Sequence, residues 1–370
     1  MADTLPLRNE VPAETTWDIS ALFSSDEAFY QTLDNTTAAA KTFNENYVHQ
    51  LDNPTIIEKA LAIYSDILVQ LDKMANYAEL RLSVDTANEQ AQTLSAKFSN
   101  TYGKIASELS FVESEILELS DDVLNHFIST SKYPHFLKKL KESKPYQLSP
   151  EVEKTLASLS SVFERPFELY GITKMLDIDF DSFEYNGKTY PLDYATFENE
   201  YEDHPEEAFR RISFKKFTDA LNKYQHTTAA TYNMQVQQEK IEADLRGYDS
   251  VIDYLLQDQE ITRDMFDRQI DVIMSNLAPI MQKYAKLIKR VHGLEVMHFE
   301  DLKISIDPNY EPDISIEDSK KYIYGALNVL GENYLNMVET AYQDRWIDFA
   351  QNKGKDTGAY CASPYALSLI

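Results

Sequence analysis

Histidine and acidic side chains are the groups with which this sequence could bind a metal or move a proton. The seven histidines are scattered: His49, His126, His135, His204, His226, His292 and His298. Zinc hydrolases often place two histidines and a glutamate on one helical face through His-Glu-x-x-His, a pattern that this sequence does not contain. The closest pair, His292 and His298, straddles Gly293, so we interpret it as a helix C-terminal cation and a loop histidine. Glu45 and His49 have one-turn spacing, which is common by chance.

Cys361 is the single cysteine, and it lacks the setting of a catalytic nucleophile. No histidine follows it, and nothing near it in the sequence would activate the thiol. Gly-rich phosphate loops, nucleophile elbows and Cys-x-x-Cys are also missing. The 24 tyrosines could line a peptide groove, although amphipathic positions at a core edge account for them as well. The residues alone therefore predict no catalytic residue and no metal ligand.

Composition and charge narrow the class of protein. With 43% hydrophobic and 26% charged residues in 370, the chain should fold into helical subdomains. A net charge of −26 argues against nucleic-acid partners and disfavours anionic membranes. The negative charge either keeps the protein soluble or attracts cationic peptides, and the net charge alone does not distinguish these two roles. One cysteine and an N-terminus without a signal-like apolar core predict a cytoplasmic protein without a membrane span.

Helices must position these residues, because apolar spacing of three and four dominates and only 9 glycines interrupt it. Ser25, Asn53 with Pro54, and Thr262 are typical of helix starts, and Gly293 of a helix end. The Pro279 ring should kink the helix that begins after Thr262. The expected helices cover 26–51, 54–71, 89–119, a segment opening at 150, 210–245, 262–292, and 315–330 with a continuation to about 348.

One short segment departs from helical spacing. Ile178-Asp-Phe180-Asp alternates apolar with acidic residues, and Asn186-Gly187 follows, which is typical of a β-hairpin with a type I′ turn. We therefore predict a mainly α, multi-helix bundle with one small hairpin near 176–192. Its boundaries divide the chain into an N-terminal helical domain (1–175), the hairpin and its connection (176–200), and a second helical region (201–370).

Several segments in chain order resemble the oligoendopeptidase F family of zinc metallopeptidases. They are Val11-Pro-Ala-Glu-Thr-Thr-Trp-Asp-Ile-Ser, Leu109-Ser-Phe-Val-Glu-Ser-Glu, Leu148-Ser-Pro-Glu-Val-Glu, the region of Arg211, Arg246-Gly-Tyr-Asp-Ser, Leu330-Gly-Glu-Asn-Tyr, and Trp346-Ile-Asp-Phe with Gly354-Lys355 and Gly358-Ala359-Tyr360. The resemblance implies a helical enzyme that hydrolyses short peptides with zinc. It also implies that Gly358, Ala359 and Tyr360 bind substrate from an edge strand near 358–363, and that 201–370 is the first, incomplete part of the catalytic domain.

The family's His-Glu-x-x-His normally follows the Gly-Ala-Tyr segment, whereas this sequence reaches Ile370 without it. We therefore expect no zinc in this chain and no hydrolysis by it alone. Self-association or disorder is expected after about Gly354, through exposed Tyr365, Leu367, Leu369 and Ile370. Two hypotheses remain, a portion of a zinc oligopeptidase or a non-catalytic helical binding or scaffold protein. Coding DNA that continues into His-Glu-x-x-His would favour the first.

Overall fold

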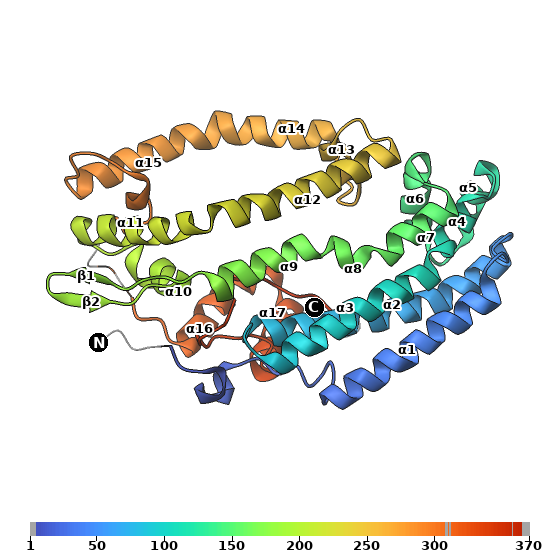
Figure 1. Cartoon of the computed structure of the whole chain (residues 1–370), viewed down its shortest axis with the longest axis horizontal. Helices are drawn as coiled ribbons and strands as arrows, with labels where there is room; N and C mark the ends of the chain where they lie inside the picture. Colours follow the sequence, from blue (N-terminus) through green and yellow to red (C-terminus); the bar gives the residue numbers. More distant parts are fainter. Residues whose placement is uncertain (1–4, 308–309, 311, 357, 365–370) are drawn as a thin grey trace. The chain divides into compact units, whose positions relative to one another are not determined.

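The computed structural model describes residues 5–307, 310, 312–356 and 358–364, and most of these residues lie in helices (Figure 1). The chain divides into two compact units, each packed mainly on itself. The terminal unit contains residues 5–168, 245–247 and the described part of 316–370, and the central unit contains the described part of 169–244 and 248–315. The boundaries expected at 175 and 200 stay a prediction. None of the described helices is long and apolar enough to cross a membrane.

The terminal unit begins with an irregular segment and a group of helices whose core lies between α1, α2 and α3. Phe29, Ile57 and Leu94 are fully buried in that core. The elements are η1 (Arg8–Glu10), η2 (Ala13–Thr15), α1 (Asp26–Tyr47), α2 (Pro54–Ser83), α3 (Glu89–Leu109), α4 (Phe111–Leu117), α5 (Asp121–Thr130), α6 (Pro134–Ser143), η3 (Lys144–Tyr146), α7 (Pro150–Ser158) and α8 (Ser160–Phe163). The unit also contains α16 (Ile316–Leu327), η8 (Asn328–Leu330) and α17 (Glu332–Gln343).

The predicted helix starts are confirmed where the capping side chain was identified. Ser25 accepts a hydrogen bond from the Ala28 amide at the start of α1, and Asn53 accepts from Thr55 and Ile56 at the start of α2. Two helices are shorter than predicted. The helix expected over 26–51 ends at Tyr47, and the one expected over 89–119 ends at Leu109, before Ser110 and the short α4.

The central unit contains the remaining elements. These are η4 (Thr173–Asp177), β1 (Phe183–Tyr185), β2 (Lys188–Tyr190), α10 (Tyr194–Thr196), η5 (Phe197–Tyr201), α11 (Glu207–Lys223), α12 (Gln225–Arg246), α13 (Val251–Gln257), α14 (Arg263–Val272), η6 (Ile273–Leu277), α15 (Ala278–Val291) and η7 (Phe299–Asp301). Helix α9 (Arg165–Ile172) and the end of α12 contain boundaries between the two units.

The predicted hairpin is confirmed, with strands shorter than the 176–192 window. Strands β1 and β2 are antiparallel, and Phe183 pairs with Tyr190. Asn186 and Gly187 both have positive φ, 49° and 78°, as a type I′ turn requires. The ring of Phe183 packs on Tyr190 and Phe209, which anchors the hairpin to α11.

The helix expected over 210–245 is two helices, α11 and α12, separated at Tyr224. The Tyr224 hydroxyl bonds the backbone of Asp177 and Asp179, a tertiary contact without a signal in helical periodicity. The long helix from Thr262 changes to π geometry over 273–277, directly before Pro279. A proline lacks an amide proton and clashes with the preceding turn, and the wider π turn accommodates it.

The edge strand expected near 358–363 is not present, which corrects that part of the fold prediction. A strand exists only as one side of a hydrogen-bonded ladder. Within the part of the chain that the structure describes, the backbone groups from Gly358 to Ala362 form no hydrogen bond with another backbone group. Residues 358–364 are irregular, apart from a bend at Gly358. The mainly α prediction with one small hairpin is otherwise confirmed.

Candidate functional site

The predicted substrate segment, Gly358 to Tyr360, contacts the end of α2 and the N-terminal segment. The Tyr360 hydroxyl shares a hydrogen bond of 2.7 Å with the Ser83 hydroxyl. Its ring meets the Trp17 indole edge to face, with 6.4 Å between the ring centroids. Burial raises the pKa of the Tyr360 phenol, so the phenol remains protonated at neutral pH and can donate hydrogen bonds. Half of the Tyr360 surface is still exposed, which leaves its ring accessible to a ligand.

A cavity of about 490 Å³ adjoins this segment, and we call it the Trp17 pocket. Four parts of the terminal unit line it: the N-terminal segment from Trp17 to Leu22, the end of α2, the helices α16 and α17, and residues from the irregular stretches 346–356 and 358–364. Most of the lining is apolar or aromatic, including Trp17, Ile323, Tyr342 and Trp346. Binding sites for small ligands generally have this size and chemistry.

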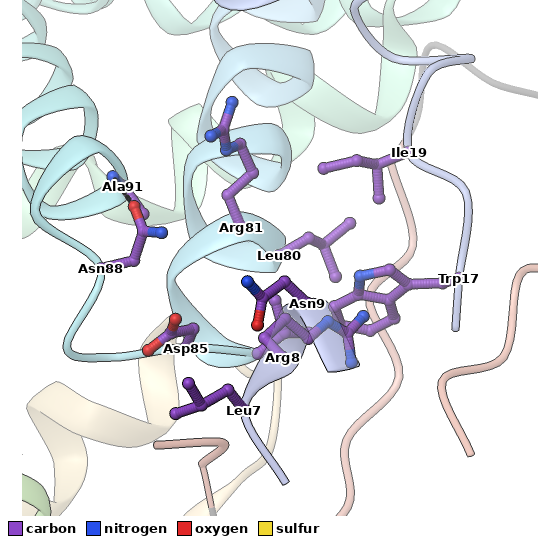
Figure 2. Close-up of a pocket in the computed structure, with 11 residues that line it drawn as sticks. Leu7, Arg8, Asn9, Trp17, Ile19, Leu80, Arg81, Asp85, Asn88 and Ala91 are labelled. Atoms are coloured by element: carbon purple, nitrogen blue, oxygen red, sulfur yellow. Dashed lines mark hydrogen bonds between the residues drawn. The ribbon is translucent and has the colours of Figure 1, made fainter. Parts of the chain in front are cut away.

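A second hollow of about 520 Å³ shares Trp17, Ile19, Leu80 and Val84 with the Trp17 pocket. Figure 2 shows its lining, which includes Leu7, Arg8 and Trp17 of the N-terminal segment and Leu80 of α2. The N-terminal segment therefore lines both hollows. What holds this segment in place determines whether either hollow persists.

A buried carboxylate fastens the N-terminal segment to the segment after α17. The Asp348 carboxylate is 4% exposed and accepts hydrogen bonds from the Arg8 guanidinium, from Lys355 Nζ at 2.7 Å and from the Trp17 amide at 3.2 Å. Burial opposes ionisation of Asp348, but the hydrogen bonds from Arg8 and Lys355 outweigh it and lower the pKa of this carboxyl. Asp348 is therefore ionised at neutral pH and positions Trp17 directly.

Backbone hydrogen bonds reinforce this connection along both segments. The Asp18 amide donates to the Arg345 carbonyl at 2.7 Å, and the Phe349 amide donates to the Thr15 carbonyl at 2.9 Å. The Thr86 amide donates to the carbonyl of Gly354 at 2.8 Å. Gly354 has a φ of +79°, and a Cβ there would lie 3.0 Å from an Asp85 oxygen, so this close approach needs glycine.

The structure does not bring the candidate histidines together. His292 follows α15 and its Nε2 lies 2.7 Å from the Ser305 carbonyl, whereas the His298 amide bonds Asp301. His49 lies beside Glu115 (Nδ1 to Oε1 3.7 Å), and its one-turn neighbour Glu45 pairs instead with a lysine. Across 5–307, 310, 312–356 and 358–364, no three His, Cys, Asp or Glu side chains are grouped as metal ligands. These residues do not fit a zinc ion.

Sequence reasoning missed the residues that organise the site. Trp346, Asp348 and Lys355 stand out in the sequence only as parts of a family-like segment, and no motif includes Arg8. Arg8 and Asp348 are 340 positions apart, so no local pattern links them. Cys361 is exposed and lines the Trp17 pocket. The four residues through which self-association was predicted all lie outside the described residues: Tyr365, Leu367, Leu369 and Ile370.

Comparisons with known proteins identify relatives along nearly the whole chain. Residues 115–180 match the family model described as Oligopeptidase F, and residues 201–367 match Peptidase family M3. Oligopeptidase PepF of Bacillus subtilis is 27% identical over 369 residues, which cover 98% of this chain and 55% of PepF. The Oligoendopeptidase F homolog of Lactococcus lactis subsp. lactis is 27% identical, covering 97% of this chain and 60% of that protein. This chain thus spans less than two thirds of these relatives.

Solved structures share the fold. The oligoendopeptidase-F from Enterococcus faecium superposes with a TM-score of 0.70 at 23% identity, covering 85% of this chain and 61% of that one. A putative peptidase from Chlamydophila abortus gives a TM-score of 0.66 at 23% identity, covering 96% of this chain and 60% of the other.

Proposed function

Because this chain belongs to the oligoendopeptidase F family within peptidase family M3, we propose that it binds short, extended peptides along Gly358 to Tyr360. The observation that carries the proposal is that this segment lines the mainly apolar Trp17 pocket. Among the described residues, the backbone groups of Gly358 to Ala362 are not engaged by other backbone groups. An extended peptide could therefore pair with them by strand addition.

Hydrolysis is a separate part of the proposal. M3 peptidases are zinc metallopeptidases, and the 370-residue sequence contains no His-Glu-x-x-His. We propose that the chain by itself binds peptides without cleaving them, and that cleavage requires zinc ligands and a general base from outside this sequence. The chain then serves as the helical part of a peptidase that receives the substrate. We propose a cytoplasmic location, because a single cysteine suits a reducing compartment. We propose no nucleic-acid or membrane partners, because the net charge is −26.

Binding should be weak. Three or four backbone hydrogen bonds at about 1 kcal/mol each do not by themselves offset the roughly 4–15 kcal/mol that association costs in lost freedom, so binding also depends on apolar contacts of the peptide with the Trp17 pocket. We expect a dissociation constant on the order of millimolar. The acidic surface should favour basic peptides, since the net charge is −26.

Calorimetric titration of the full chain with a short basic peptide tests binding, and mass spectrometry of the same peptide tests cleavage. Saturable millimolar binding without cleavage supports the proposal, and Tyr360→Ala should weaken it. No heat at millimolar peptide would contradict peptide binding. Cleavage that co-purifies with the chain through successive columns, and that Tyr360→Ala reduces, would contradict the non-hydrolytic part.

A different class of function, a non-catalytic helical binding or scaffold protein, remains the second candidate. The exposed apolar side chains of α12 and α14 favour it, because surfaces of this kind commonly contact other proteins. Tyr232, Ile241 and Ile270 are 71%, 60% and 44% exposed. Micromolar peptide affinity that is lost in Tyr360→Ala would favour this candidate, since it exceeds what a portion of an enzyme should retain.

A further inference from the structure

We propose that the Trp17 pocket is a specificity pocket that holds one aromatic or large aliphatic side chain of the bound peptide. The proposal rests on the proposed function, because it assumes that the peptide backbone lies along Gly358 to Tyr360. That segment forms part of the pocket wall, so a side chain projecting from a peptide paired with it has direct access to the cavity. At about 490 Å³ the cavity is in the range that accommodates small organic groups.

Three of the four charged side chains that line the pocket, Asp18, Asp348 and Lys355, already have charged partners, so charge is not the main basis on which the pocket selects a ligand. Asp348 is satisfied by Arg8 and Lys355. Asp18 accepts from the Ser20 amide and lies 3.4 Å from Arg345. A cationic or anionic side chain placed here would lose its hydration without a new partner, at a considerable cost in free energy.

The apolar lining supplies the attraction instead. Trp17, Tyr342, Trp346 and Tyr360 come from three separate parts of the chain and present aromatic surface to one cavity. Aromatic rings prefer edge-to-face or offset contacts, and Trp17 with Tyr360 already shows the edge-to-face geometry. A phenyl or isobutyl group entering the cavity would bury apolar surface on several sides, whereas a methyl group would not.

Trp17 is held rigidly enough to discriminate between side chains. Its amide donates to the buried Asp348 carboxylate at 3.2 Å, and the amide of the next residue donates to the Arg345 carbonyl at 2.7 Å. Tyr360 is fixed through its hydrogen bond to Ser83. These contacts act on the two rings that border the proposed peptide path, so Trp17 and Tyr360 are the expected specificity-determining residues. When the side chains of a pocket are already fixed, binding costs less conformational entropy, and the pocket selects more strongly for a ligand that fits its shape.

The test separates the pocket from the strand-addition site by using two kinds of probe on the full chain. N-acetyl-phenylalanine amide and N-acetyl-alanine amide, followed by NMR, report on the pocket alone. Two pentapeptides that differ only by phenylalanine or alanine at the central position, followed by calorimetry, report on both sites. We expect the phenylalanine member of each pair to bind at least about tenfold more tightly, the discrimination that a hydrophobic pocket typically achieves.

Variants assign the discrimination to the pocket. Trp17→Ala removes a wall and Ala341→Phe fills the cavity, and each should reduce the phenylalanine-to-alanine ratio to about one. Phe299→Ala removes an exposed ring from the central unit and should leave the ratio unchanged. Circular dichroism confirms that each variant is folded, and Ala341→Phe keeps the test valid if Trp17→Ala does not fold.

The outcomes distinguish the two proposals. Equal binding of phenylalanine and alanine probes to the wild-type chain overturns the specificity pocket, even if both peptides bind and the proposed function holds. Discrimination between the amides without any peptide binding supports the pocket and contradicts the strand-addition site. Discrimination that survives in both pocket variants overturns the assignment to this cavity.

Discussion

Replacing Asp348 by asparagine removes the charge that fastens the N-terminal segment to the segment after α17. The carboxylate is 4% exposed, and the side chains of Arg8 and Lys355 are 19% and 18% exposed. Removing one partner of a buried ion pair costs about 3–5 kcal/mol, because the remaining charge stays buried without compensation. Water reaches part of both cations here, so the lower limit applies. We expect Asp348→Asn to reduce the free energy of unfolding of the terminal unit by about 3 kcal/mol.

The two tryptophans, Trp17 and Trp346, allow the loss in free energy of unfolding to be measured in the terminal unit itself. Both line the Trp17 pocket and the sequence has no others, so intrinsic fluorescence during urea unfolding reports on the terminal unit. With a urea dependence of about 3 kcal/mol per molar, the transition midpoint should fall by roughly 1 M. Circular dichroism on the same samples reports on all helices, and a difference between the two transitions would reveal that the units unfold separately.

The pH dependence of the loss tests its electrostatic origin. The pKa of Asp348 is lower in the folded state than in the unfolded state, so its contribution is complete above the unfolded pKa of about 3.9 and disappears as pH falls through the folded value. Wild type and Asp348→Asn should therefore differ fully at pH 7 and converge below about pH 4. The matched control in the terminal unit is Glu45→Gln, which removes an exposed i,i+4 partner of Lys41 and should cost less than about 0.5 kcal/mol. An Asp348→Asn loss no larger than the control at pH 7 would refute the reasoning.

Three further outcomes follow from the backbone, the surface and the histidines. Gly354→Ala should lower the free energy of unfolding by about 1–2 kcal/mol, because the φ of Gly354 is +79° and a Cβ would lie close to Asp85. Gly325→Ala in α16, where a Cβ meets no neighbouring atom and φ is not positive, should raise the free energy of unfolding by roughly 0.5–1 kcal/mol. Equal effects of the two substitutions in urea titrations would contradict this prediction. Light scattering should reveal concentration-dependent self-association, and a strict monomer with a protease-resistant region after Gly354 argues against it. Elemental analysis of the purified chain should find no stoichiometric zinc, and near-stoichiometric zinc would make His292 and His298 the first residues to replace.

Local signals in the sequence predicted the parts of the fold that depend on a few neighbouring residues. Ser25 and Asn53 cap helices through side chains that reach amides two or three positions away. Asn186-Gly187 specifies its turn because both positions have positive φ. The break at Tyr224 escaped prediction because its cause is a contact with residues more than 40 positions earlier. Helical periodicity continues through such a break without any local mark.

The candidate site was predicted only in part for the same reason. A resemblance to known proteins pointed to Gly358, Ala359 and Tyr360, while the pocket beside them depends on Trp17 and on the pairing of Arg8 with Asp348. Ion pairs between distant residues have no spacing to recognise, and every acidic residue is a candidate partner for every basic one. The spacing of Ile270, Ile273 and Leu277 by three and four in the sequence indicates one helical face, yet these side chains are 44–47% exposed. Spacing identifies an apolar face without identifying what covers it.

The hydrogen bonds between Thr15, Asp18 and residues 345–349 also set the order of events while the protein is being made. Trp17 leaves the ribosome early, but Trp346 and Asp348 are synthesised about 330 residues later. At about 5–20 residues per second, the N-terminal segment waits roughly 15–65 s for its partners. Helices α1 to α3 contain their own core and can form during that interval. The pocket is therefore the last part of the terminal unit to assemble in a nascent chain, and fast dilution from denaturant, which presents both segments at once, should form it without that delay.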